Sequence, residues 1–382
     1  MKGKKWFGKL HRWLGLASGL VVFIIALTGA IYCFAPELQN LQSYRHVREE
    51  SKPFLPPSHM QQIAESRLPG KTLQRIYYDA GDKAVMVLFG QKDVYSYSVF
   101  INPYSGDVLK VRNNDRDFLS VVLQIHRTLK IPFGHEIIRW STVIFLFMLI
   151  SGLVLWWPKN RRTAKQSFRI MWRASPKRLN YDLHKVLGFY ISWIAIFMAL
   201  TGLLFAFESF ADFTYKLTGS RQSIVQKKPP LSDTTVGSQN KTAAIDLVWT
   251  GVEPDLHRKY ASAMFVLPAA KNGPVLLRAN PDKATLYKTD FRYFDQYTGK
   301  EIPGAYVWGH YRDAQTLSDN IKRMNYDLHT GALFGLPGRI ALFFVALIVA
   351  SLPLTGAYFW WGKRRKNKKK GFLLKTRLSA PA

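Results

Sequence analysis

The sequence predicts an α-helical membrane protein: a four-helix transmembrane bundle produced by a tandem duplication, with two α+β modules outside the bilayer. Three observations predict this fold class. Four apolar stretches are long enough to cross a membrane, basic residues gather beside them, and one motif recurs in both halves of the chain. A hydrophobic content of 48% and a net charge of +29 are compatible only if apolar and basic residues are segregated along the chain.

The four apolar stretches comprise residues 13–35, 137–157, 185–207 and 338–361. Each is close to the roughly 20 residues that a helix needs to cross the hydrocarbon core. Two long segments separate them in pairs, residues 36–136 and 208–337, and we expect each to form one extramembrane module.

Basic residues flank these stretches on one side only. Residues 1–12 contain five Lys or Arg, residues 158–185 contain nine, and residues 362–382 contain nine, against one acidic residue, Asp182. The positive-inside bias therefore predicts a cytoplasmic N-terminus (1–12), a cytoplasmic loop (158–184) and a cytoplasmic tail (362–382). Basic runs can also indicate nucleic-acid binding. Because these runs directly adjoin apolar helices, we expect them to contact membrane lipid and not nucleic acid.

The duplication is visible in repeated motifs at fixed offsets. Asn180–His184 reads Asn-Tyr-Asp-Leu-His, and so does Asn325–His329. His11 precedes the first apolar stretch as His184 precedes the third, and Thr28-Gly29 recurs as Thr201-Gly202 at the same offset of 173 residues. His126 and His329 precede the second and fourth stretches. Each half is therefore predicted to be helix, module, helix.

The first module has clear α+β signals. Residues 57–67 predict a short helix, and strands are expected at 72–79, 83–90, 93–101 and 107–112, separated by turn residues. The second module has a turn at Asp295–Gly299 that matches the turn at Asn102–Gly106.

The four repeated histidines are candidate metal ligands, because ionisable groups at membrane depth are costly and four at matched positions require a reason. In the predicted topology, His11 and His184 lie at the inner face and His126 and His329 at the outer face. About twenty helical residues separate the faces by roughly 30 Å, so only these two pairings are possible. Two axial imidazoles on one iron suit electron transfer. Cys33 is the only cysteine, which excludes an iron–sulfur cluster and covalent haem attachment. The sequence thus predicts two haem b groups; ordinary interfacial histidines are the alternative.

Small residues occur at the depth of each predicted site. Gly29 and Gly202 are expected beside the outer pair, and Gly152 and Gly356 beside the inner pair, where the missing side chains would make room for a porphyrin. Close helix packing through small residues is the alternative interpretation.

The role of several charged residues near these sites has two interpretations. Arg139 and Arg339 begin two membrane helices and would bind either haem propionates or lipid headgroups. His135, which has no counterpart in the second half, is a weaker candidate as a replacement ligand or a group facing substrate. Asp182 and Asp327 are expected to cap helices.

Three of these motifs carry a family resemblance: His-[Arg/Lys]-x-x-Gly at the start of a helix, Asn102–Asp107 at a strand turn, and Ser/Thr-Gly followed by Trp-Trp at helix ends. In this order they resemble the PepSY-associated transmembrane proteins, which include iron-regulated membrane proteins and siderophore reductases of the bacterial inner membrane. The resemblance covers nearly the whole chain. It implies PepSY-like modules in the periplasm, b-type haems and reduction of ferric chelates.

The sequence therefore predicts an inner-membrane dihaem b reductase that passes electrons to a periplasmic ferric chelate such as a ferric siderophore and releases Fe(II). No dinucleotide-binding or nucleotide-binding motif occurs, so the electrons are expected from a cytoplasmic donor or quinol. No catalytic residue is assigned beyond the haem ligands. The alternative is a membrane-anchored PepSY protein without redox chemistry, which would bind or regulate envelope peptides or proteases.

Overall fold

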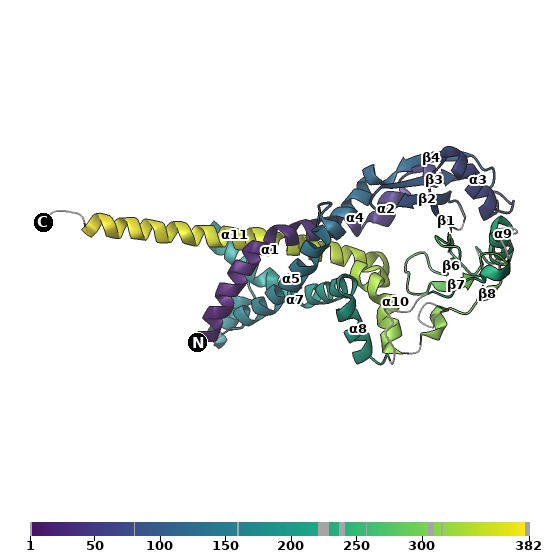
Figure 1. The fold of residues 1–382 in the computed structure, drawn as a ribbon. Helices are drawn as coiled ribbons and strands as arrows, with labels where there is room; N and C mark the ends of the chain where they lie inside the picture. Colours follow the sequence, from purple (N-terminus) through teal and green to yellow (C-terminus); the bar gives the residue numbers. More distant parts are fainter. Residues whose placement is uncertain are drawn as a thin grey trace. The chain divides into compact units, whose positions relative to one another are not determined.

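The computed structural model describes residues 2–79, 81–158, 160–220, 229–236, 241–256, 258–304, 309–314 and 316–378. The chain forms two compact units, each described here by itself (Figure 1). The membrane unit comprises Met1–Cys33, Val122–Phe207 and Arg339–Ala382, and the sheet unit comprises Phe34–Val121 and Glu208–Gly338.

Four long helices dominate the membrane unit: α1 (Lys2–Tyr32), α5 (Gly134–Trp156), α7 (Pro176–Ala206) and α11 (Gly335–Leu378). Each contains a window whose mean hydropathy is at least 2.0, and each is long enough to cross a membrane. The prediction of four membrane-crossing helices is therefore confirmed by length and composition.

Large apolar side chains on these helices point away from the protein interior. Leu20 on α1 is 69% exposed, Phe197 on α7 is 70% exposed and Phe344 on α11 is 57% exposed. Water would penalise such a surface, whereas lipid solvates it at no cost. The exposed apolar residues thus agree with a membrane protein.

The helices extend beyond the apolar stretches into their basic flanks. α1 begins at Lys2, α7 begins at Pro176 and α11 continues to Leu378; residues 379–382 of the predicted tail lie outside the described residues. Lys and Arg are good helix formers, so a basic flank does not end a helix. Pro176 occupies the first turn of α7, where its missing N–H is harmless.

The prediction that Asp182 and Asp327 cap helices is wrong, because each lies inside a helix. Asp182 lies inside α7, where it is 1% exposed and accepts a hydrogen bond from Nε of Arg178 at 3.0 Å. Asp327 lies inside α10 (Leu317–Thr330), is fully buried, and accepts hydrogen bonds from the backbone N–H groups of Leu286 and Tyr287, at 2.9 and 2.7 Å. Asp182 also accepts a hydrogen bond from the backbone N–H of Met171 at 3.4 Å, so both carboxylates hold a neighbouring segment against their helix.

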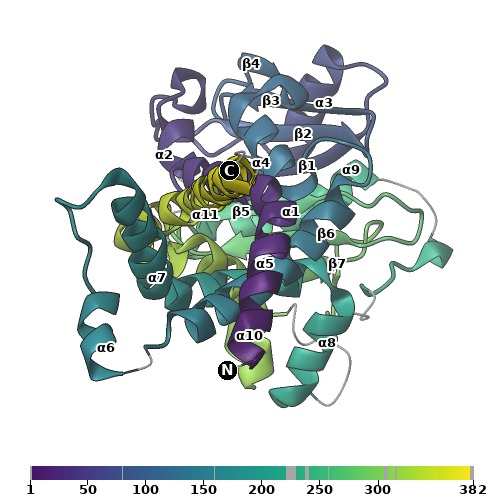
Figure 2. The ribbon, with the colours of Figure 1, turned by 90° about the vertical axis from the view of Figure 1, so that its left-hand side faces the viewer.

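One antiparallel sheet of eight strands forms the centre of the sheet unit (Figure 2). The first half of the chain supplies β1 (Leu73–Asp79), β2 (Val85–Gln91), β3 (Tyr95–Ile101) and β4 (Val108–Asn113), close to the four predicted strands. The second half supplies β5 (Ser262–Val266), β6 (Val275–Asn280), β7 (Asp290–Phe294) and β8 (Glu301–Ile302). The order is β4-β3-β2-β1-β5-β6-β7-β8, so the two predicted modules share a sheet through β1 and β5.

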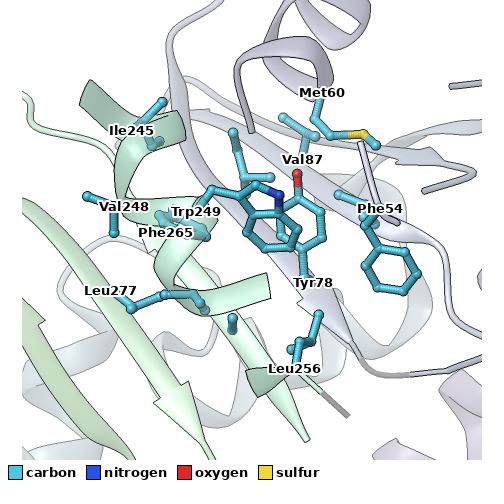
Figure 3. Packing of buried hydrophobic residues seen from close by; sticks show 14 of the residues in the cluster. Phe54, Met60, Tyr78, Val87, Ile245, Val248, Trp249, Leu256, Phe265 and Leu277 are labelled. Atoms are coloured by element: carbon cyan, nitrogen blue, oxygen red, sulfur yellow. The ribbon is translucent and has the colours of Figure 1, made fainter. Parts of the chain in front are cut away.

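Two helices, α3 (Pro57–Arg67) and α9 (Lys241–Val252), pack on one face of this sheet and enclose its hydrophobic core. α3 matches the predicted helix at 57–67. Tyr78 of β1 stacks on Trp249 of α9 with ring centres 4.2 Å apart, and Phe265 of β5 lies beside both (Figure 3). The core therefore contains side chains from both halves of the chain.

The remaining helices of the sheet unit are shorter. They include α2 (Ala35–Asn40), α8 (Glu208–Leu217) and α10, and α4 (Phe118–Thr128) leads from the sheet unit into the membrane unit. α10 begins with a capping box formed by Thr316 and Asp319, and ends at Gly331, whose φ of 75° favours glycine.

Candidate metal centre

Two of the predicted ligands, His11 and His184, lie next to each other in the membrane unit. His11 comes from α1 and His184 from α7; their ring centres are 6.5 Å apart and their planes are nearly perpendicular, at 87°. A metal ion is about 2.0–2.1 Å from an imidazole nitrogen, so two imidazoles on opposite sides of one ion have ring centres roughly 6–6.5 Å apart. The observed separation of the ring centres agrees with this distance.

A serine hydroxyl determines the tautomer of His11. Nδ1 of His11 lies 2.9 Å from Oγ of Ser151 on α5. Oγ of Ser151 in turn donates its only hydrogen to the carbonyl of Met148 at 3.1 Å. Because that hydrogen is committed, the hydroxyl accepts from His11, and the imidazole hydrogen is on Nδ1. Nε2 of His11 therefore retains its lone pair.

His184 is held in the same way by a threonine. Its Nδ1 lies 2.9 Å from Oγ1 of Thr355 on α11, and that hydroxyl donates to the carbonyls of Ser351 and Leu352, each at 3.0 Å. The same reasoning places the hydrogen on Nδ1 of His184. Both nitrogens available for a metal are thus Nε2 atoms, and each opposite nitrogen is fixed by a hydrogen bond, as in most histidine–metal sites.

The glycines of the inner pair lie against these imidazoles. A Cβ atom at Gly152 would be 3.5 Å from Cε1 of His11, and one at Gly356 would be 3.3 Å from Cε1 of His184. Each ring therefore rests on a helix surface without a side chain, beside the hydroxyl of the preceding residue. The glycines make room for the imidazole, and the predicted clearance for a porphyrin stays a prediction.

His126 on α4 also lies beside a hydroxyl group and a glycine. Its Nδ1 lies 3.0 Å from the carbonyl of Ile25 and 3.2 Å from Oγ1 of Thr28, both on α1. A carbonyl can only accept, so Nδ1 carries the hydrogen and Nε2 is left with its lone pair. A Cβ at Gly29 would be 3.2 Å from Cε1 of His126. His11, His184 and His126 thus share one arrangement. Nδ1 lies within hydrogen-bond distance of a Ser or Thr hydroxyl, and Cε1 lies against the glycine that follows that Ser or Thr in the sequence.

The family model for the PepSY-associated TM region matches residues 9–363, which include all four repeated histidines. The chain belongs to the PepSY-associated transmembrane family. A comparison with curated proteins finds no match.

His329, the fourth predicted ligand, lies in the last turn of α10 in the sheet unit. Asp327, two residues earlier, anchors that helix to the backbone at Leu286 and Tyr287. Gly202 lies in α7 of the membrane unit. The pairing of His329 with His126, and a role for Gly202 beside them, stay predictions of the sequence.

The predicted arginines of this PepSY-associated protein have protein partners. Nη1 of Arg139 donates to Glu136 at 2.7 Å, and its guanidinium lies 4.4 Å from the ring centre of Phe207. Nη1 of Arg339 donates to the carbonyl of Cys33 at 3.3 Å. Both arginines therefore fix helix ends, and their contact with propionates or headgroups stays a prediction.

His135 lies in the first turn of α5 with its side chain 56% exposed, 3.7 Å from Glu136. The structure gives it no contact with the histidines of the membrane unit that are described above, so it does not join the inner pair.

The donor set of this PepSY-associated protein fits haem better than a bare metal ion. Among the described residues, no group of three or more His, Cys, Asp or Glu could enclose a metal ion. A structural or catalytic zinc site needs three or four protein ligands. Haem brings four nitrogen ligands of its own and needs only two axial imidazoles. His11 and His184 would be the residues that hold it.

The hydroxyl groups of Thr28, Ser151 and Thr355 are site residues that sequence reasoning missed. The sequence indicated these positions only as small residues beside a glycine. The signal was present, because a hydroxyl residue precedes every glycine of the repeat, at Thr28, Ser151, Thr201 and Thr355. The sequence does not give the orientation of the imidazole ring. That orientation determines that Nδ1, and not Nε2, lies within hydrogen-bond distance of the hydroxyl.

Proposed function

We propose that this protein is a dihaem b reductase of the bacterial inner membrane that transfers electrons to a periplasmic ferric chelate and releases Fe(II). The observation that carries the proposal is the inner histidine pair. Two imidazoles whose ring centres are 6.5 Å apart, each with Nδ1 bound to a hydroxyl, would suit the two axial positions of one haem. Family membership supports the same function by resemblance.

Haem held by His11 and His184 would supply one-electron transfer at this site. The protein's own contribution is positional. Ser151 and Thr355 keep the hydrogen on Nδ1 of their histidines and so fix the ring orientation. The apolar surfaces of the surrounding helices exclude water, which would favour a low-dielectric site. Arg12 and Lys185 directly follow the two histidines in the sequence and would bind either propionates or lipid headgroups; Nζ of Lys185 donates to Oγ of Ser167 at 2.7 Å.

The outer site is proposed from the repeat. His126 has the same hydroxyl-and-glycine environment as the inner histidines, and His329 is its counterpart in the second half. The inner and outer sites together would connect a cytoplasmic donor or quinol with a ferric chelate on the other side. Reduction weakens the binding of iron by hard oxygen donors, because Fe(II) carries less charge than Fe(III).

We further propose that the chain arose by tandem duplication and that each half carries a PepSY module, with both modules in the periplasm and both termini in the cytoplasm. The repeated motifs support the duplication, and the strand order supports it as well, because each half adds its four strands outward from the sheet centre. The basic flanks support the orientation.

A reduced-minus-oxidised spectrum of the purified protein, with a pyridine haemochrome assay, tests the proposal. Two b haems per chain are expected. His11→Ala and His184→Ala should each remove the same haem, whereas His135→Ala, at an exposed position, should keep both. A colourless wild-type protein would contradict the proposal and leave the membrane-anchored binding protein as the better reading. Loss of spectroscopically different haems in the two alanine variants would contradict the inner pairing.

A further inference from the structure

The second face of the sheet, opposite α3 and α9, has an unusual composition. Side chains alternate along a strand, so Ile76 and Tyr78 of β1 enter the core while Arg75 and Tyr77 point to the other face. Across the strands, the register aligns one row of that face: Phe100, Met86, Tyr77, Met264, Arg278 and Phe291. This row combines aromatic and thioether groups with a cation.

Four arginines, which we call the arginine face, surround this row: Arg45, Arg75, Arg112 and Arg278. The guanidinium carbons of Arg45 and Arg112 lie 5.0 and 5.2 Å from the ring centre of the same phenylalanine, Phe100. The guanidinium of Arg278 lies 5.0 Å from the ring centre of Phe291. The arginines thus stack on aromatic rings at both ends of the row, from η1 (Ser43–Arg45) and β4 at one end and from β6 at the other.

Within the part of the chain that the structure describes, these four cations have one neighbouring carboxylate, that of Asp117, which also favours the charged form of Arg45. Arg112 pairs with Asp117 at 3.4 Å, but among the described residues no carboxylate lies within 4.0 Å of the guanidinium of Arg45, Arg75 or Arg278. Nε of Arg278 is buried without a hydrogen-bond partner. Burial, followed by the neighbouring Arg75, lowers the pKa of Arg278. Burial, followed by the neighbouring Arg112, lowers the pKa of Arg45.

Gathering like charges in a half-buried place costs free energy unless an anion compensates them. A second basic site in the sheet unit, a pocket, allows a comparison of how its charges are paired. It has a volume of about 450 Å³ and is lined by Arg258, Lys259 and Lys283 among others. Two of its cations already pair with Asp255, at 3.4 and 3.6 Å. The pocket is also lined by Glu49 and Asp82, whereas the four cations of the arginine face share the single carboxylate of Asp117 among the residues that the structure describes.

We propose that the arginine face is the binding site for the ferric chelate, and that it selects an anionic chelate with oxygen donors and an aromatic or apolar periphery. The guanidinium groups would donate to the ligand oxygens, since arginine presents a planar set of N–H donors that suits paired oxygen atoms. Phe100 is 1% exposed beneath Arg45 and Arg112 and supports them, while Tyr77, Phe291, Met86 and Met264 would receive the periphery of the chelate. This inference rests on the proposed function for the identity of the ligand, but the site lies entirely in the sheet unit and contains no haem ligand.

Equilibrium binding of two iron complexes to the purified full chain tests the proposal. The probes are a trianionic ferric tris-catecholate and an uncharged ferric tris-hydroxamate, measured by calorimetry without any electron donor. The tris-catecholate should bind at least about tenfold more tightly, and its affinity should fall as salt is raised. Arg45→Gln and Arg278→Gln should each weaken its binding about tenfold, because each removes a charged donor.

Arg292→Gln is the matched control, because Arg292 is a sheet arginine that already pairs with Glu301 at 2.6 Å, and its affinity should equal that of the wild type. Arg278→Lys keeps the charge but loses the planar set of donors, so it should bind more tightly than Arg278→Gln and more weakly than the wild type, which separates loss of charge from misfolding. Equal loss in the Arg292 control, no preference for the anionic probe, or unchanged affinity in both glutamine variants would each overturn the site. Because binding is read without electron transfer, a protein without haem could still bind the tris-catecholate, and a dihaem protein could fail to do so.

Discussion

Replacing Thr355 with valine removes the hydroxyl that holds His184 while keeping a side chain of nearly the same shape. In the wild type, that hydroxyl lies 2.9 Å from Nδ1 of His184 and is oriented by the carbonyls of Ser351 and Leu352. Without it, the Nδ1 hydrogen of a metal-bound imidazole loses its hydroxyl acceptor and has only the backbone carbonyl of Leu352 beside it. A free imidazole can instead move its hydrogen to Nε2, so the penalty falls on the bound form.

The expected magnitude follows from the lost hydrogen bond. Loss of a hydrogen bond behind a metal-bound histidine typically weakens metal affinity about 10- to 100-fold. We therefore expect Thr355→Val to release haem from the inner site about 10- to 100-fold more readily. Its midpoint potential should rise, because an imidazole without this acceptor donates less electron density to Fe(III).

The assay is transfer of haem from the purified protein to excess apomyoglobin, together with a spectroelectrochemical titration. Thr142→Val is the matched control, because the hydroxyl of Thr142 on α5 bonds only to the carbonyl of Ile138 in its own helix, at 2.8 Å. The control should behave as the wild type. If both variants lose haem at the same rate and titrate at the same potential, Thr355 does not position His184 and the tautomer argument fails.

Gly356→Ala should disturb the inner haem spectrum more than Gly152→Ala. The new Cβ at position 356 would be 3.3 Å from His184, whereas the new Cβ at position 152 would be 3.5 Å from His11. Absorption and paramagnetic resonance spectra of the two variants test this. Asp327→Ala should lower the free energy of unfolding by about 2–3 kcal/mol, because two backbone N–H groups lose their acceptor; thermal unfolding measures it. Lys322→Met should raise the free energy of unfolding at pH 7 by about 1–2 kcal/mol, since burial lowers the pKa of Lys322 to about 8.

The pH dependence of the wild type checks the sign of the lysine effect. Between pH 8 and 10.5 the unfolded chain binds more protons at Lys322 than the folded protein, so this residue's contribution to stability rises with pH in that window. Lys322→Met should therefore lose its advantage as pH approaches 10.5. An exposed lysine such as Lys300 serves as control, and its methionine variant should show no such trend.

For the glycine variants, a larger change of the inner haem spectrum in Gly152→Ala than in Gly356→Ala would contradict the packing of the imidazoles on α5 and α11.

The sequence by itself determined the elements that depend on local pattern. Apolar length predicted the four membrane helices, and alternation with turn residues predicted the helix at 57–67 and strands β1 to β4 to within about two residues. These features follow from nearest neighbours along the chain, because hydrophobic length and side-chain alternation are properties of a segment alone. The repeat also placed His11 and His184 in one candidate pair before any distance was known.

Tertiary structure decided everything that depends on which segments meet. The extent of α7 placed Asp182 inside a helix instead of at its cap, because Lys and Arg continue a helix that apolar content alone would end. The antiparallel pairing of β1 with β5 made one sheet out of two predicted modules, and no local pattern specifies the partner of a strand. The hydroxyl groups of Ser151 and Thr355 reach the imidazoles of His11 and His184 only because α5 and α11 lie beside α1 and α7. A hydrogen bond between residues 140 or 171 positions apart is set by packing, and a sequence carries no direct record of it.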